Sequence, residues 1–160
     1  MKSRLILLLA IAFLIGFSYP TFGQNRPVWF VKIESELDRG EWRTVRNRIY
    51  LWDHSQKFHS GTIQTVHKGE FNATVDIKLE ASVQEAKNTF KLFLPVRKSK
   101  EKADLKTIPG LGDESQLSTL TRWVEIRFRK RRVYVVILGS TEETARTMAN
   151  LVASQIPDKN

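Results

Sequence analysis

A dense group of basic residues in the C-terminal third of the chain has the chemistry to bind an anion. The planar guanidinium of arginine can bind a phosphate or a carboxylate through two parallel hydrogen bonds, and neighbouring aromatic rings such as Trp123 and Tyr134 can stack on a ligand. The group consists of Arg122, Arg127, Arg129, Lys130, Arg131 and Arg132. These residues are a candidate anion-binding site. The interpretation that we favour is a solvated hairpin tip whose outward arginines pair with Glu125 and neighbouring acids.

Two adjacent carboxylates, Asp113 and Glu114, follow the segment "IPGLG" and could in principle act as a general acid and base. Adjacent side chains usually point apart, however, and no second polar group of catalytic type stands near them. The two glycines also lack the lysine and hydroxyl of a phosphate-binding loop. A proline that fixes φ and glycines that allow positive φ favour a structural turn, with Leu111 reaching the core. The predicted turn residues are Pro109, Gly110, Gly112 and Asp113.

The chain has three histidines and no cysteine, which leaves few ligands for a metal ion. The histidines are His54, His59 and His67, and their spacing fits no common ligand pattern. A site built from Asp53, His54 and His59 is the one alternative. We predict no metal, no other cofactor and no catalytic residue.

The first residues have the pattern of a secretory signal peptide. Lys2 and Arg4 precede an apolar run from Leu5 to Phe17, which is shorter than the roughly 20 residues that span a bilayer. Thr21 and Gly23 are small residues at the third-last and last positions before a cleavage site. We predict a signal peptide over residues 1–23, cleaved near Gly23. The alternative is an uncleaved N-terminal anchor.

Composition limits what the exported protein can be. The absence of cysteine excludes a disulfide framework and the acylated cysteine of a bacterial lipoprotein. Residues 24–160 have the length of one domain. The signal peptide holds two of the 26 Lys and Arg residues and none of the 17 Asp and Glu residues, so the remaining chain has a formal net charge of +7. A basic exported domain is attracted to anionic lipid, polysaccharide or another polyanion.

Hydrophobic periodicity predicts both strands and helices. We expect two or three strands, with a hairpin, over residues 28–51, and a loop or irregular strand over residues 53–70. Residues 72–79 alternate as a half-buried strand, with Ala73, Val75, Ile77 and Leu79 on one face. Ser82 and Glu85 form a capping-box pattern that starts a helix, which ends before Pro95.

The second half predicts a charged connector, a hairpin and a final helix. The connector covers residues 96–107 and is rich in ionised side chains. In the following hairpin, Val124, Ile126 and Phe128 are expected to point inward, and Glu125, Arg127 and Arg129 outward. Ser140 and Glu143 repeat the capping-box pattern before a helix that stops at Pro157. The order of elements predicts a single α+β domain, an antiparallel sheet with two helices packed on it.

Several of these segments together resemble a known class of protein. The segments are "VDIKLEASVQEAKNTFKLF", "IPGLGDESQ", the basic hairpin and "STEETARTMANLVASQI", within residues 72–157. They resemble small exported bacterial proteins of uncharacterised function with a PGLGDE turn, of the PsbP-like α/β/α sandwich class. The resemblance implies a non-catalytic accessory or binding domain in which Gly110, Gly112 and Asp113 are structural. The basic hairpin departs from the usual pattern of that class.

The expected function is therefore binding by an exported protein, periplasmic or extracellular. Its ligand would be an anionic surface or polymer held by the basic hairpin, or a protein partner. The sequence contains no motif that reads bases, so we expect no sequence-specific contact with nucleic acid. Two alternatives stay open, a cell-envelope hydrolase that uses Asp113 and Glu114, and a structural component of an envelope complex.

Overall fold

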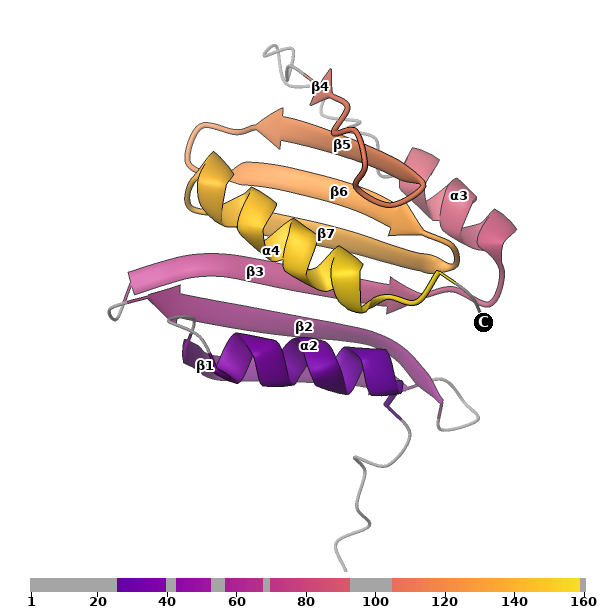
Figure 1. Ribbon diagram of the computed structural model, residues 1–160, viewed down its shortest axis with the longest axis horizontal. Helices are drawn as coiled ribbons and strands as arrows, with labels where there is room; N and C mark the ends of the chain where they lie inside the picture. The colour runs from indigo at the N-terminus through magenta and orange to yellow at the C-terminus, as the bar shows by residue number, and fades with distance from the viewer. Residues whose placement is uncertain (1–25, 40–42, 53–56, 68–69, 93–104, 159–160) are drawn as a thin grey trace, which may run out of the picture.

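The computed structural model describes residues 26–39, 43–52, 57–67, 70–92 and 105–158, which form one antiparallel sheet and three helices (Figure 1). The strands lie in the order β1-β2-β3-β7-β6-β5-β4, and every neighbouring pair is antiparallel. Their bounds are β1 Arg43–Trp52, β2 Phe58–His67, β3 Glu70–Leu79, β4 Leu105–Lys106, β5 Glu114–Thr119, β6 Val124–Lys130 and β7 Val133–Gly139. The predicted α+β fold is confirmed. The predicted signal peptide, residues 1–23, lies outside the described residues.

The helices divide the sheet into two unlike faces. Helices α2 (Val28–Arg39) and α4 (Glu142–Gln155) lie side by side over one face, which we call the covered face (Figure 1). Helix α3 (Val83–Leu92) contacts β6 and β7 from the other side, where Phe90 meets the ring of Tyr134. We call this second face the open face, because the short helix α3 is the only described helix that packs on it. The described chain therefore has three helices on the sheet, one more than the sequence predicted.

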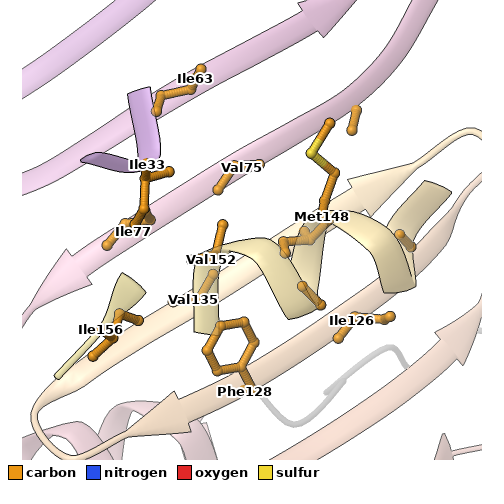
Figure 2. Close-up of a cluster of buried hydrophobic side chains, with 14 of the residues drawn as sticks. Ile33, Ile63, Val75, Ile77, Ile126, Phe128, Val135, Met148, Val152 and Ile156 are labelled. Carbon is orange, nitrogen blue, oxygen red and sulfur yellow. The ribbon is translucent and has the colours of Figure 1, made fainter. Parts of the chain in front are cut away.

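The hydrophobic core lies between the covered face and its two helices. Ile33 of α2 and Met148 and Val152 of α4 meet side chains of the central strands (Figure 2). The strands contribute alternate residues, as a sheet with one buried face requires. The labelled strand residues in Figure 2 are Ile63, Val75, Ile77, Ile126, Phe128 and Val135. The predicted inward faces of residues 72–79 and of the hairpin strand 124–130 are confirmed.

Residues 28–39 form a helix, so the hairpin predicted for residues 28–51 is wrong in its first half. The buried positions of α2 are Phe30, Ile33, Glu34 and Leu37, which is the i, i+3, i+4, i+7 spacing of one helical face. A glutamate interrupts that apolar stripe and obscured it in the sequence. Its carboxylate is buried because Arg26 pairs with it and the hydroxyl of Tyr50 donates a hydrogen bond to it.

Residues 58–67 form a full strand, although the sequence predicted a loop or an irregular strand for residues 53–70. Strand β2 is paired on both sides and has a register shift between Thr65 and Val66. It is polar because its residues on the open face are not covered by α2 or α4. Gly61 is needed for packing: a Cβ atom there would lie 2.5 Å from Cζ of Phe30.

The predicted charged connector, residues 96–107, falls mostly outside the described residues. Its described end includes β4, a two-residue strand that pairs with Leu117 and Ser118 of β5. This part of the prediction is wrong, since residues 105–106 belong to the edge of the sheet.

Both predicted capping motifs lie at helix starts, but with altered partners. The Ser82 hydroxyl accepts a hydrogen bond from the Glu85 amide at 3.1 Å, while the Glu85 carboxylate accepts one from Ala81 N at 3.0 Å. At α4 the cap is Thr141, not Ser140. The hydroxyl of Thr141 accepts a hydrogen bond from the amide of Thr144. The capping box predicted for Ser140 and Glu143 is therefore wrong, because the cap lies one residue later, at Thr141.

We expect Thr141→Ala to lower the free energy of unfolding by about 1 kcal/mol, because the first turn of α4 loses its cap. The matched change Ser140→Ala should cost less than about 0.5 kcal/mol, as for an ordinary surface substitution. Urea unfolding of the two variants measures the difference. Equal losses, or a larger loss for Ser140→Ala, would contradict the assignment of the cap.

Candidate binding groove on the open face of the sheet

The turn at residues 109–113 has the structural geometry that the sequence predicted. Gly110 and Gly112 have φ values of 79° and 67°, and the Leu111 side chain between them is buried. An added Cβ at Gly112 would lie 2.5 Å from the carbonyl oxygen of Arg129, whereas one at Gly110 would meet nothing within 4 Å. The carbonyl of Arg129 accepts a hydrogen bond from Asp113 N at 2.7 Å. Gly112 thus lets the turn approach the hairpin closely, and Pro109 lies exposed beside it.

Arg129 joins the turn to the hairpin. The register places it on the face away from the core, as predicted, but its side chain is buried. Its side chain is only 4% exposed, and Nη1 lies 2.7 Å from Asp113 Oδ2 while Nη2 lies 3.1 Å from Glu114 Oε1. Nη1 also donates to the carbonyl of Arg131, whose amide donates to Asp113. The antiparallel register sets Arg129 directly opposite Glu114, which explains this ion pair. Both carboxylates that were considered for catalysis therefore bond to a buried guanidinium.

The other residues of the predicted anion-binding site are divided among separate parts of the surface. Lys130 Nζ lies 2.8 Å from Asp158 Oδ1 and donates to the carbonyl of Ala153, so the pKa of Asp158 falls below its usual range. Arg131 donates to the carbonyl of Asp158. Arg122 and Arg132 are exposed, but they lie at opposite ends of β6. The six residues do not form one continuous basic surface.

The remaining member, Arg127, lies on the open face of the sheet and lines a groove of about 550 Å³. Side chains from β1, β2, β3, β6 and β7 surround this groove, which we call the open-face groove. Its lining residues include Leu51, Thr62, Asp76, Arg127, Tyr134 and Val136. The register explains their placement, because residues directly opposite one another on neighbouring strands share a face. One row of paired residues crosses the open face from β1 to β6, and it consists of Ile49, Thr62, Asp76, Val136 and Arg127.

Tyr134 is the buried aromatic residue of the groove. Its ring meets Phe90 of α3 edge to face, with centroids 6.3 Å apart. Burial raises the pKa of Tyr134 to about 12; nearby Arg127 lowers that pKa, and Glu125 raises it. The phenol is thus a neutral hydroxyl over the physiological pH range. It closes the groove on the side where α3 packs.

An ion pair lies beside Tyr134 on the β3 side. Lys78 Nζ lies 2.8 Å from Glu80 Oε1, and Thr89 of α3 donates a hydrogen bond of 2.5 Å to the same carboxylate. Burial raises the pKa of Glu80. The contacts with Lys78 and Thr89 lower that pKa by more, so the net shift is downward. Glu80 therefore stays ionised and holds Lys78 in place at the groove.

Of the candidate metal ligands, only His59 has a side chain within the described part of the chain. His59 lines the open-face groove, whereas Asp53, His54 and the side chain of His67 lie outside the described residues. Over the ranges that are described, no three His, Asp or Glu side chains are placed to hold a metal ion. None of the helices α2, α3 and α4 is long and apolar enough to cross a membrane.

Sequence reasoning singled out Arg127 and Tyr134 as ligand-binding candidates but did not bring them together with the strands β1, β2 and β3 that complete the groove. The available signal was the polar side of β3, where Thr74, Asp76 and Lys78 alternate with buried residues. Such alternation indicates a sheet face without a helical cover. The contribution of β2 could not be found, because that segment was interpreted as a loop or an irregular strand.

A scan with protein-family models finds no match to the chain, and a search of curated proteins finds no significant relative.

We expect Gly112→Ala to destabilise the protein more than Gly110→Ala. Both substitutions place a side chain at positive φ, which costs roughly 1 kcal/mol or more. Only the change at Gly112 also drives a Cβ atom against the Arg129 carbonyl. The difference in unfolding free energy should exceed about 1 kcal/mol. Similar melting temperatures for the two variants would show that the turn does not approach the hairpin in this way.

The raised pKa of Tyr134 predicts a loss of stability in alkali. A tyrosine in the unfolded chain ionises near pH 10, so the folded state keeps its proton to higher pH. This contribution to stability is fully present below about pH 10 and is lost as the pH rises toward about 12. Urea unfolding at about pH 9 and about pH 11 should show a smaller loss for Tyr134→Phe than for the wild-type protein. Equal losses would place the phenol in water.

Proposed function

We propose that the protein is exported and acts by binding rather than by catalysis, and that its ligand lies in the open-face groove. The predicted signal peptide over residues 1–23 supports export. The interactions of Asp113 and Glu114 with Arg129 support a structural role for these two carboxylates. The resemblance to the PsbP-like sandwich class belongs to the same proposal, since that class implies a binding or accessory domain.

The observation that carries the proposal is the composition of the open face. Ligand sites in proteins are concave and largely apolar, with a few well-placed polar groups. The open-face groove combines the apolar side chains of Leu51 and Val136 with the hydroxyl of Tyr134 and two charged side chains, Asp76 and Arg127. On an ordinary solvated sheet face the side chain of an arginine is mostly exposed, whereas that of Arg127 is 15% exposed. This supports a surface adapted to a ligand.

The groove is better supported than the basic hairpin as the binding surface. A polyanion such as heparin or anionic lipid needs several cations that are free and close together. Of the six residues predicted for that role, Arg129, Lys130 and Arg131 are bonded within the protein. The exposed Arg122 and Arg132 do not neighbour each other. An attraction to anionic surfaces through net charge alone is compatible with a ligand in the groove.

A tryptophan in the groove tests the proposal. We expect Thr62→Trp to fill the groove, and Thr147→Trp, on the exposed side of α4, to serve as the matched control. Wild-type protein and control should be stabilised against heat by at least one class in a panel of amino acids, sugars, nucleotides and fatty acids. At a hundredfold excess over the dissociation constant, the gain is about 2.7 kcal/mol. The Thr62→Trp variant should show no such gain.

Two outcomes would contradict this assignment. One is stabilisation that is the same in Thr62→Trp as in the control, which would place the ligand elsewhere. The other is the absence of stabilisation by every class in the panel. Circular dichroism of both variants before the titration shows whether the sheet is intact.

A further inference from the structure

Two side chains of opposite charge stand on either side of one strand in the open-face groove. The register sets Asp76 of β3 and Arg127 of β6 opposite the same residue of β7, Val136. Neighbouring strands are about 4.8 Å apart, so the Cα atoms of the two charged residues are separated by about 10 Å. Both side chains rise from the same face of the sheet. A small molecule lying over Val136 can therefore contact both.

Arg127 has hydrogen-bonding capacity that the protein does not use. Its Nε lies 2.6 Å from Glu125 Oε1, which makes an ion pair without the alignment of a hydrogen bond. Its Nη1 is buried and has no hydrogen-bond partner among the described residues. A guanidinium carries five N–H donors. A buried donor without a partner is unfavourable, and a ligand oxygen can satisfy it once the side chain turns toward the ligand.

Asp76 also has capacity to spare. Its side chain is half-buried in the groove, and none of the ion pairs or side-chain hydrogen bonds found in the described part of the chain involves its carboxylate. The neighbouring cation Lys78 is held by Glu80 instead. The groove thus contains one acidic side chain, Asp76, and one cation, Arg127, that are not paired with each other.

Apolar side chains extend the groove on the β1 side. Leu51 lines it, and Ile49 lies opposite Thr62 in the row of Asp76. These side chains are 57% and 54% exposed, which is unusual for large aliphatic residues on one sheet face. Across the open face, the order is therefore a cation, an anion and then an apolar surface.

We propose that the open-face groove binds a zwitterion of the amino-acid class with an apolar side chain. The ligand carboxylate lies against Arg127, its ammonium group against Asp76, and its side chain against Leu51 and Ile49. This inference rests on the proposed function above and specifies its ligand. A plain anion would leave Asp76 beside a like charge, and a plain cation would face Arg127. Only a ligand that carries both charges satisfies both residues.

Calorimetric titration with three probes tests the charge pattern. L-leucine carries both charges, N-acetyl-L-leucine lacks the ammonium group, and L-leucinamide lacks the carboxylate. We expect L-leucine to bind at least about tenfold more tightly than either blocked form, a factor that corresponds to about 1.4 kcal/mol. Each probe should be titrated to about 10 mM, which is ten times a dissociation constant of about 1 mM.

Two variants assign each ligand charge to its residue. Asp76→Asn should abolish the discrimination between L-leucine and N-acetyl-L-leucine while keeping that between L-leucine and L-leucinamide. The double change Glu125→Gln with Arg127→Gln should do the reverse, and it removes the ion pair without leaving an unpaired carboxylate. A purely structural role for these residues would weaken all three probes alike, so the pattern of discrimination separates the two explanations.

The outcomes also separate this inference from the proposed function. Equal binding of L-leucine and its blocked forms, unchanged discrimination in both variants, or no heat from any of the three probes overturns the zwitterion. If another class of compound then stabilises the protein and Thr62→Trp prevents it, the groove stands as the binding surface with a different ligand. If Thr62→Trp changes nothing, the groove itself is wrong.

Discussion

The structure depends on an unequal burial of the two faces of its sheet. Helices α2 and α4 together bury alternate residues of the central strands, and this single apolar layer supplies almost the whole core. Sheets with one buried face alternate apolar and polar residues along each strand. Because the core lies on one side of the sheet, the short helix α3 is the only described helix on the other face. The open-face groove exists because the fold is stabilised elsewhere.

A second constraint fixes the end of the sheet where the turn meets the hairpin. Buried Arg129 bonds to Asp113, to Glu114 and to the carbonyl of Arg131. Removing one partner of a buried charged pair is far more costly than losing a surface ion pair. Gly112 must accordingly be a glycine for these contacts to form. In the densest charged region of the sequence, Arg129, Lys130 and Arg131 therefore stabilise the fold, whereas Arg127 lines the open-face groove with a buried donor that has no partner among the described residues.

The parts of the fold that the sequence predicted are those in which local pattern and tertiary environment agree. The hairpin of β6 and β7, strand β3 and helices α3 and α4 have the period and end signals of their type. Helix α2 was mistaken for strands because Glu34 occupies a buried position, and its partners Arg26 and Tyr50 cannot be recognised from spacing. Strand β2 was missed because Gly61 was taken for a loop signal, whereas it accommodates the Phe30 ring.

The same limits apply to the candidate site. A cluster of cations is visible in a sequence, but its division among buried, bonded and exposed positions depends on partners that are distant along the chain. Asp76 and Arg127 are 51 positions apart in the numbering and meet only through the register of β3, β7 and β6. The turn was predictable because proline and glycine restrict or free the backbone locally, without reference to distant residues.

The contact between α2 and α4 has a consequence for how the molecule folds. These are the first and last helices of the described chain, and the apolar stripes of both are buried in the same core. Strands β1, β2 and β3 can pair as soon as they are synthesised, but the layer above them stays incomplete until α4 has been made. Contacts between residues so far apart in sequence close late, because the loop entropy must be overcome first. In the nascent chain, Phe30 can therefore pack early against Tyr50 and Phe58, whereas the core positions that α4 covers on β3, β6 and β7 stay exposed until the last helix has been made.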